Sequence, residues 1–350
     1  MPTIGWDIGG VNTKAAHVAG DEVLSVVGRP YEIQRAPSAL VPLLREMFAE
    51  VGGHESMSHA LTMTAELSQM FRTKREGVQF VVQAVEEAFP GTSIRVYSVD
   101  GSFLTPAEAR DTPLSVAAAN WAATARVVAD HHADALLVDI GTTTTDLIPI
   151  AGGRVAALGR TDPERLMSAE LLYTGALRTP TEAILGCVPL HDGLAGVSAE
   201  GFALSGDVHV WRGDLDADDY TCPTPDGRPA SREFAGERLA RMVCADREML
   251  DEVSISRLAD AVARAQVRSI QAAIQRVLER HSSIRVAVVT GMGAFLGMAA
   301  AAALNLEVVP LSHRLGDAGA RCAPAVAVAL LLECHRRRVQ TAFNPERGDT

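Results

Sequence analysis

The amino-acid sequence predicts an α/β protein made of two related lobes. Segments with the apolar pattern of strands alternate with segments of helical spacing through most of the 350 residues. One strand–turn–strand pattern also occurs twice, because Asp7-Ile8-Gly9 recurs as Asp139-Ile140-Gly141, 132 residues later (139 minus 7). A repeated opening of this kind predicts one lobe over residues 1–131 and a second over residues 132–350.

In the first lobe, strands are predicted to come before the helices. The turn Gly20-Asp21 separates extended runs over residues 15–19 and 22–27, which predicts a hairpin beside a first strand over residues 3–8. The remaining elements follow in order: a helix over 39–51, a strand over 60–64, a helix over 78–89, a strand over 94–99 and a long alanine-rich helix over 115–131.

The second lobe is predicted to repeat this opening and then to diverge. Strands are expected over residues 135–140, 146–150 and 154–159. Asp162 with Pro163 is expected to begin a helix, and Glu170 falls two turns into it. The Asp- and Pro-rich stretch 205–231 is expected to be an irregular surface excursion. The later elements are helices over 234–245 and 255–280, a strand over 284–290, a helix over 294–304 and a closing buried helix over 325–334.

Composition excludes several classes of function. The 43 acidic side chains outnumber the 32 Lys and Arg, giving a formal charge of −11, so a general binder of nucleic-acid backbones is not expected. No apolar run approaches the roughly 18 residues that span a bilayer, and the start has no basic leader. The five cysteines are scattered and include no CxxC pair, which favours a cytoplasmic protein without disulfides or a zinc knuckle. The histidines His191 and His209 fit no familiar metal-site spacing, so a His/Cys metal site is not expected. A homo-oligomer is left open.

The first repeated turn has the composition of an anion-binding loop. Backbone amides of Gly9 and Gly10 can point at one anionic oxygen, and Asn12, Thr13 and Lys14 add side-chain donors. Asp7 would repel a bare phosphate but suits Mg²⁺. A hairpin whose glycines serve geometry alone explains this turn equally well.

The second copy strengthens the functional interpretation. Four hydroxyl residues follow Gly141, of which Thr142, Thr143 and Thr144 complete the turn, and Asp139 precedes it as a candidate metal ligand. A run of threonines can also reflect β-propensity. Two donor-rich turns facing one another across a cleft between lobes would clamp a di- or triphosphate with its magnesium.

Three further segments are candidates for ligand contacts. Gly291 and Gly293 form a strand-to-helix turn that can approach a nucleotide or substrate closely, although such turns are common in α/β proteins. Arg72 and Lys74, the latter one of only two lysines, form a basic corner that can receive a carboxylate or is simply solvated. Glu66 is a candidate base or ligand, or a carboxylate near a helix start.

Together with Thr290-Gly291-Met292-Gly293, the two turns resemble the superfamily of sugar kinases, heat-shock chaperone ATPases and actin. The residues of these motifs are similar to those of hydantoinase/oxoprolinase-related proteins of the tetrahydromethanopterin-linked one-carbon pathway. That group includes the condensing enzyme of methanofuran biosynthesis. The resemblance implies actin-like or ribonuclease H-like lobes with the ligand cleft between them, one phosphate loop in each lobe, and an adenosine-binding turn in the second.

The same resemblance implies a transferase reaction. The phenol oxygen of γ-glutamyltyramine would displace diphosphate from aminomethylfuran-methyl diphosphate, with Lys14 and Mg²⁺ near Asp7 and Asp139 stabilising the leaving group. A phenol has a pKa near 10, so a base is needed, and the sequence does not choose among Asp139, Asp146 and Glu170. Arg72 and Lys74 would hold the glutamyl carboxylate.

Two alternatives use the same turns. An ATP-dependent small-molecule kinase would place the ATP phosphates on both turns and adenosine over Gly291–Gly293. A nucleotide-operated interaction protein would close its lobes on nucleotide and bind a protein partner. No role follows for the stretch 205–231.

Overall fold

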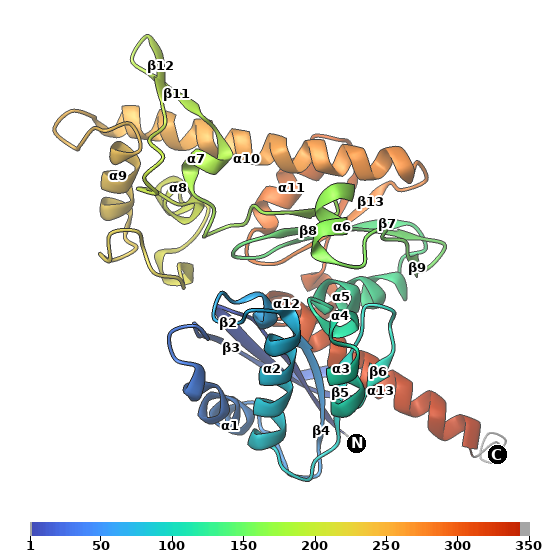
Figure 1. The fold of residues 1–350 in the computed structure, drawn as a ribbon. Coiled ribbons are helices and arrows are strands. Elements are labelled where there is room, and N and C mark those ends of the chain that lie inside the picture. The colour runs from blue at the N-terminus through green and yellow to red at the C-terminus, as the bar shows by residue number, and fades with distance from the viewer. Residues whose placement is uncertain (1, 344–350) are drawn as a thin grey trace. The chain divides into compact units, whose positions relative to one another are not determined.

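A computed structural model describes residues 2–343, which form two compact units (Figure 1). The first unit comprises residues 2–134, 150–164 and 311–343, and the second comprises residues 135–149 and 165–310. This division differs from the expected one at residue 131, because the chain returns to the first unit twice. The closing helix α13 (Ala323–Phe343) packs on strands β1, β2 and β4 of the first unit, which the local sequence pattern does not reveal.

The sheet of the first unit has the strand order β3-β2-β1-β4-β5-β6. The predicted hairpin around Gly20 is confirmed, and it pairs antiparallel to β1, whereas β1, β4 and β5 are mutually parallel. The strands are β1 (Thr3–Ile8), β2 (Asn12–Ala19), β3 (Glu22–Pro30), β4 (Ser58–Met63), β5 (Ile94–Tyr97) and β6 (Phe103–Leu104).

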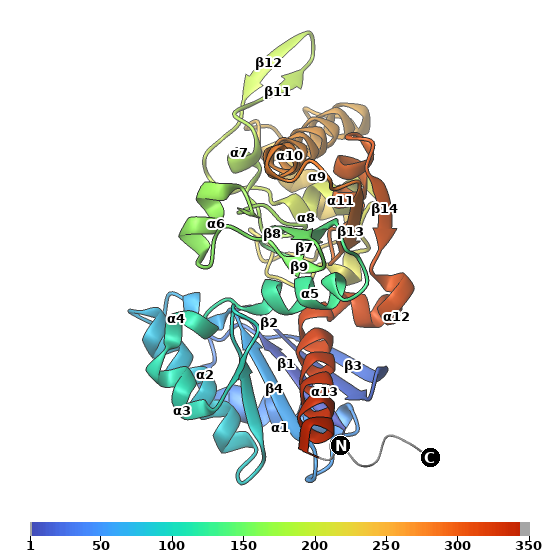
Figure 2. The ribbon, with the colours of Figure 1, turned by 90° about the vertical axis from the view of Figure 1, so that its right-hand side faces the viewer.

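Helices cover both faces of this sheet because alternate residues of β1 point to opposite sides. Ile4, Trp6 and Ile8 join a buried cluster with α1 (Leu40–Glu50) and α2 (Lys74–Ala88). On the other face, a Cβ on Gly5 would lie 1.9 Å from the Ala325 carbonyl oxygen, so α13 approaches the strand at glycine (Figure 2).

Shorter elements complete the first unit. The expected long helix over 115–131 is broken into α4 (Pro113–Val116) and α5 (Asn120–Ala129), because Ala118 adopts a positive φ of 49° between them. The others are η1 (Pro37–Ala39), η2 (Ala65–Leu67), α3 (Pro106–Asp111), β9 (Arg154–Val155), the start of α6 (Asp162–Ser168) and α12 (Ser312–Arg321).

The sheet of the second unit repeats the first in its strand order, β10-β8-β7-β13-β14, with β9 also pairing to β8. Strands β7, β13 and β14 are parallel. Each unit therefore has a hairpin-bearing first strand followed by parallel strands reached through helices, which confirms two related lobes of the actin-like/ribonuclease H-like type. The strands are β7 (Ala135–Ile140), β8 (Thr145–Ala151), β10 (Leu171–Leu172), β13 (Val286–Thr290) and β14 (Glu307–Pro310).

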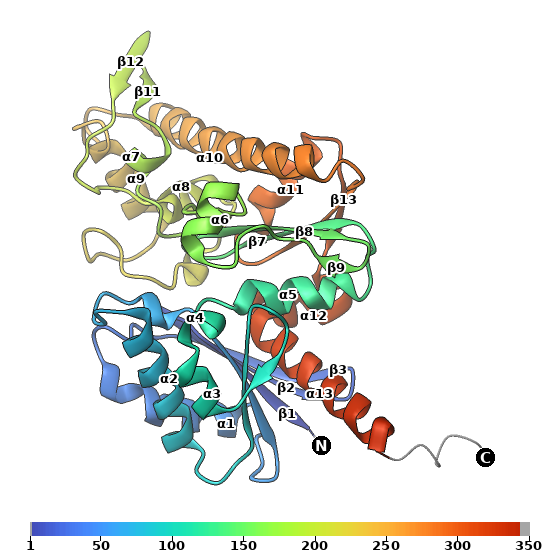
Figure 3. The ribbon, with the colours of Figure 1, turned by 45° about the vertical axis from the view of Figure 1, so that its right-hand side comes forward.

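Two helices, α10 (Glu252–Arg280) and α11 (Ala294–Ala302), pack against the sheet to form the core of the second unit. Their buried residues pack against β7 and β13 (Figure 3). The N-terminal part of α10 packs with α8 (Ser205–Arg212) and α9 (Arg232–Arg241) in a second buried cluster. Smaller elements are α7 (Thr181–Ile184), the hairpin β11 (Cys187–Leu190) and β12 (Gly193–Gly196), and η3 (Ala217–Asp219).

The expectation of an irregular excursion over 205–231 is wrong for its first part. Residues 205–212 form the buried helix α8, which ends at Gly213 with φ 78°. Asp207 is fully buried, accepts a hydrogen bond from the Leu204 amide at 2.9 Å and pairs with Arg238 at 2.8 Å. The aspartate thus caps a helix and is neutralised inside the unit, so its presence does not indicate a solvated loop.

Within residues 2–343, no single helix is both long and apolar enough to cross a bilayer. The bent pair α12 and α13, which meet at 119°, passes the same length and composition test only when taken together.

Candidate active site

The first repeated turn joins β1 to β2 at the carboxyl end of the parallel strands. The Gly9 amide donates to the Asn12 carbonyl oxygen at 2.9 Å, and a Cβ on Gly9 would lie 2.7 Å from that oxygen, so the turn requires glycine here. The Thr64 amide, just beyond β4, donates to the Ile8 carbonyl oxygen at 3.0 Å. The segment after β4 therefore borders the turn.

Asp7 and Lys14 face one another across the first turn. They are direct partners in the β1–β2 register, and the Lys14 Nζ lies 3.7 Å from an Asp7 carboxylate oxygen. Asp7 is buried, whereas the Lys14 side chain is 30% exposed. The two residues assigned separately to metal and phosphate thus form an ion pair, and the lysine offsets the charge with which Asp7 would repel an anion.

The second turn has the same backbone hydrogen bond, from the Gly141 amide to the Thr144 carbonyl oxygen at 2.9 Å. The chain after β10 runs over it: the Ala176 amide donates to the Gly141 carbonyl oxygen at 2.9 Å, and a Cβ on Gly175 would lie 2.6 Å from the Thr143 backbone. Thr142 and Thr143 remain half-buried, with their hydroxyl oxygens 3.4 Å apart.

The glycine turn after β13 lies directly beside this second turn. Thr290 is the partner of Asp139 in the β7–β13 register, and the Gly293 amide donates to the Ile140 carbonyl oxygen at 2.8 Å. Gly291 has φ 88°, and a Cβ there would lie 2.6 Å from an Asp139 carboxylate oxygen. The structure therefore brings two separately predicted motifs, Asp139–Thr144 and Gly291–Gly293, into one site.

The remaining two candidate bases contact arginines. An Asp146 carboxylate oxygen lies 2.6 Å from the buried Arg165 guanidinium. The Glu170 side chain is fully buried, with one oxygen 3.5 Å from Arg280. Its expected place within a helix is wrong, because α6 ends at Ser168 and Ala169 takes a φ of 60°, so Glu170 leads into β10. Both carboxylates are thus held by protein groups.

The basic corner also differs from its expected form. Lys74 begins α2, and its Nζ lies 2.6 Å from an Asp162 carboxylate oxygen and 3.6 Å from an oxygen of Glu66. Arg72 is exposed. The Glu66 side chain is fully buried in η2, where burial raises its pKa to about 7 and the Lys74 charge opposes that rise. Lys74 therefore forms ion pairs with two carboxylates of the protein itself. One of them, Asp162, is 88 residues away in the sequence and could not be predicted from local patterns.

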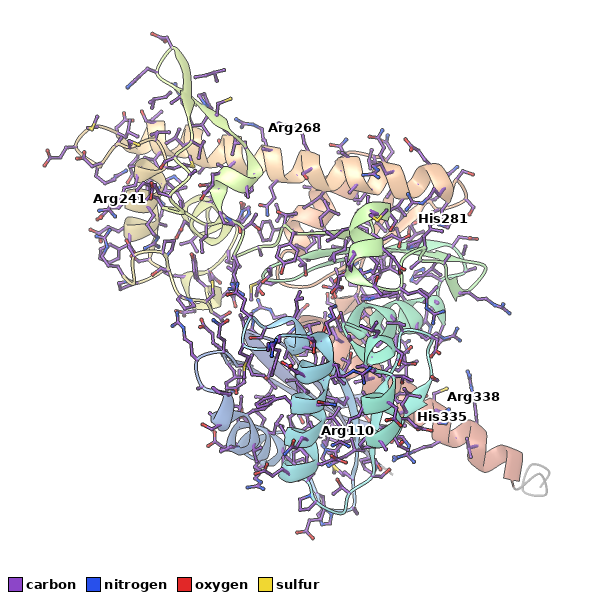
Figure 4. The ribbon with its side chains drawn as sticks, in the orientation of Figure 1. Arg110, Arg241, Arg268, His281, His335 and Arg338 are labelled. Atoms are coloured by element: carbon purple, nitrogen blue, oxygen red, sulfur yellow. The ribbon has the colours of Figure 1, made fainter. Side chains whose placement is uncertain are left out.

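A buried amide supports the segment that covers the second turn. The Gln266 Nε2 donates to the Thr174 hydroxyl at 2.9 Å and to the Gly175 carbonyl oxygen at 2.8 Å, while its Oε1 faces the His209 Nε2 at 2.9 Å. Gln266 lies in the middle of α10, and the exposed Arg268 two positions later lies on another face of that helix (Figure 4). Neither Gln266 nor this role of His209 has a signal in the sequence pattern.

The donor set of the second turn fits Mg²⁺. Within the described residues no group of three or more His, Cys, Asp or Glu side chains could hold a metal ion. Mg²⁺ usually needs only one or two carboxylates and takes its other ligands from water and substrate phosphates. Asp139, 9% exposed beside the half-buried Thr142 and Thr143, provides this kind of carboxylate.

The sequence of this chain is similar to those of two proteins that share one name. The chain is 34% identical over 332 residues to "(4-{4-[2-(gamma-L-glutamylamino)ethyl]phenoxymethyl}furan-2-yl)methanamine synthase" of Methanocaldococcus jannaschii, covering 94% of this chain and 97% of that protein. A protein of the same name from Methanococcus vannielii is 32% identical over 202 residues, 57% of this chain and 90% of that protein.

Fold similarity extends to a much more distant enzyme. The nucleotide-free structure of an acetone carboxylase matches with a TM-score of 0.55 at 11% identity, over 94% of this chain and 70% of that one. The hydantoinase/oxoprolinase profile matches residues 58–335, which include the second turn and the glycine turn after β13. The chain is therefore a member of the hydantoinase/oxoprolinase family.

Proposed function

We propose that this protein is an enzyme that makes (4-{4-[2-(γ-L-glutamylamino)ethyl]phenoxymethyl}furan-2-yl)methanamine, an ether of methanofuran biosynthesis. The observation that carries the proposal is the 34% identity, over nearly the whole of both chains, to a synthase of that name. The two donor-rich turns support it, because the reaction releases an anionic leaving group. The substrates would be γ-glutamyltyramine and aminomethylfuran-methyl diphosphate.

In this reaction the phenol oxygen forms a bond to the furanylmethyl carbon as the bond from that carbon to diphosphate breaks. The furan ring stabilises positive charge on the carbon, so the main task of the protein is to stabilise the departing diphosphate. Lys14 at the first turn and the hydroxyls of Thr142 and Thr143 at the second are the groups proposed to do this. The phenol proton must pass to a base.

The other sequence-derived roles are kept with two changes. Mg²⁺ would supply positive charge to the diphosphate, and Asp139, which precedes the threonine-rich second turn, is its proposed ligand, whereas Asp7 is assigned to the pair with Lys14. The glutamyl carboxylate is assigned to the exposed Arg72, since Lys74 contacts Asp162 and Glu66.

The test combines purified protein, Mg²⁺, γ-glutamyltyramine and the furan diphosphate without ATP. The expected result is the ether, identified by mass spectrometry, with release of one diphosphate per ether formed. Production of ADP from ATP that depends on a small hydroxylated substrate, without any ether, would overturn the proposal in favour of the kinase alternative.

A further inference from the structure

One buried carboxyl group in the first unit lies close to the first turn. Glu66 follows β4 by three residues, and Thr64 between them is hydrogen-bonded to the end of β1 at 3.0 Å. A Cβ on Gly77 of α2 would lie 2.4 Å from the Glu66 Cα, so α2 packs tightly onto this segment and fixes its position. The carboxyl ends of parallel strands are where ligands bind in open α/β sheets.

The carboxyl group of Glu66 lacks the partners that buried carboxylates usually have. Its side chain is 0% exposed, and neither oxygen has a hydrogen-bond partner in the described part of the chain. Burying a carboxylate without hydrogen bonds is costly for stability, and the Lys74 charge 3.6 Å away offsets only part of that cost, because the pKa of Glu66 stays raised. Such groups concentrate at functional sites.

Two charged groups face Glu66 from neighbouring elements. Lys74 of α2 places its Nζ 3.6 Å from Glu66 Oε1, and Asp162 of α6 lies 2.6 Å from the same Nζ. Burial and the Asp162 charge raise the pKa of Glu66, whereas Lys74 lowers it, and the resulting value is about 7. A carboxyl group with this pKa can exchange a proton at neutral pH.

Lys74 is the more exposed member of its pair with Glu66. Its side chain is 22% exposed, whereas Glu66 is not exposed at all, and its ammonium group lies 3.6 Å from Glu66 Oε1. The shorter contact to Asp162 anchors the ammonium on the other side. Proton transfer from a phenol would require the Lys74 ammonium to move off Glu66 Oε1 while it keeps its contact to Asp162, and apo structures often leave such catalytic contacts incomplete.

From this geometry we infer that Glu66 is the base that accepts the phenol proton, while Lys74 and Asp162 are positioning residues. The inference rests on the proposed ether synthesis. In that step the phenol O–H proton moves to a Glu66 carboxylate oxygen, the phenol oxygen bonds to the furanylmethyl carbon, and diphosphate leaves with the electrons of the broken C–O bond. No oxidant or further reactant is needed.

The central experiment compares Glu66→Gln with Glu66→Asp and the wild type. We expect Glu66→Gln to lower kcat by at least about 100-fold, and Glu66→Asp to retain part of the activity. The rise of wild-type kcat with pH around neutrality should disappear in Glu66→Gln. A kcat within threefold of wild type in Glu66→Gln would overturn the inference.

Thermal unfolding separates this role from a structural one. Because a raised folded-state pKa makes the ionised carboxylate unfavourable above neutrality, Glu66→Gln at pH 8 should keep or raise the Tm. A Tm that falls in proportion to activity would assign Glu66 a structural role. A wild-type protein that forms no ether would overturn both proposals, whereas an active wild type with an equally active Glu66→Gln would overturn this one alone.

The neighbouring charges provide a second readout. Lys74→Met should move the rise of kcat to higher pH, because the lysine lowers the pKa of Glu66. Asp162→Asn should move it to lower pH, because the aspartate raises that pKa. Shifts in the same direction, or no shift in either variant, would contradict the assignment.

Discussion

The two repeated turns share a backbone and differ in charge. The amide-to-carbonyl bond of Gly9 to Asn12 recurs between Gly141 and Thr144 at the same length, 2.9 Å. Seven residues after the aspartate, however, the first copy has Lys14 and the second has Asp146. The first turn therefore carries its own cation, whereas Asp146 of the second contacts the arginine of α6.

This difference indicates how each turn would bind an anion. The first can use an ammonium group that is 30% exposed. The second would use backbone amides and hydroxyls, together with the proposed Mg²⁺, because Arg165 is buried against Asp146. The two turns therefore share one backbone arrangement and differ in the charged side chains around it.

The largest expected effect comes from removing the second aspartate. Asp139→Asn should lower kcat for ether formation by about 100- to 1000-fold while leaving the Tm nearly unchanged, because a proposed metal ligand is lost without a change in shape. Asp7→Asn, the matched change in the first turn, should cost less, since Asp7 is paired with Lys14. Equal losses in the two variants would break the proposed division between the turns.

Next in size is a stability effect confined to the second copy. Asp146→Ala leaves the Arg165 guanidinium buried without its carboxylate partner, which should cost about 3 kcal/mol of unfolding free energy. If the second unit, residues 135–149 and 165–310, unfolds as one cooperative unit, its Tm should fall by about 6–12 °C. The double variant Asp146→Ala with Arg165→Met should recover part of that loss. If the single variant melts like the wild type, the ion pair has no structural importance.

A smaller effect is expected at the corresponding position of the first turn. Lys14→Met should raise the KM for the furan diphosphate by about 10- to 100-fold, because a charge-assisted contact to the leaving group is lost. Lys14→Arg keeps the charge and is the control, with partial recovery expected. An unchanged KM in Lys14→Met would show that the first turn does not bind the diphosphate.

The smallest effect concerns the support behind the second turn. Gln266→Leu removes its hydrogen bonds to Thr174 and Gly175, and it should cost about 1–2 kcal/mol and raise the KM a few-fold. Arg268→Ala, on the exposed part of the same helix, should change neither quantity. Should the two variants behave alike in binding assays, the buried amide does not position the turn.

Local features of the fold could be predicted from the sequence. Both turns, the first hairpin and most helices follow from apolar spacing and glycine positions, because these act over a few residues. The ion-pair partners of Lys74 and Asp207 could not be predicted in this way. Asp162 is 88 residues from Lys74, and Arg238 is 31 residues from Asp207. The prediction that Glu170 lies in a helix is wrong for a similar reason. Helix α6 ends at Ser168, because the chain then turns back so that β10 can pair with β8.

The position of α13 has a consequence for biosynthesis. The first unit is begun by residue 2, yet one face of its sheet is covered by a helix that starts at Ala323, with the backbone of Ala325 seated on Gly5. A nascent chain cannot cover this face of the first unit until α13 has been synthesised, and by then residues 165–310, most of the second unit, have already been synthesised. A chain truncated before residue 323 would therefore leave the face of the sheet at Gly5 and Ala60 exposed to solvent.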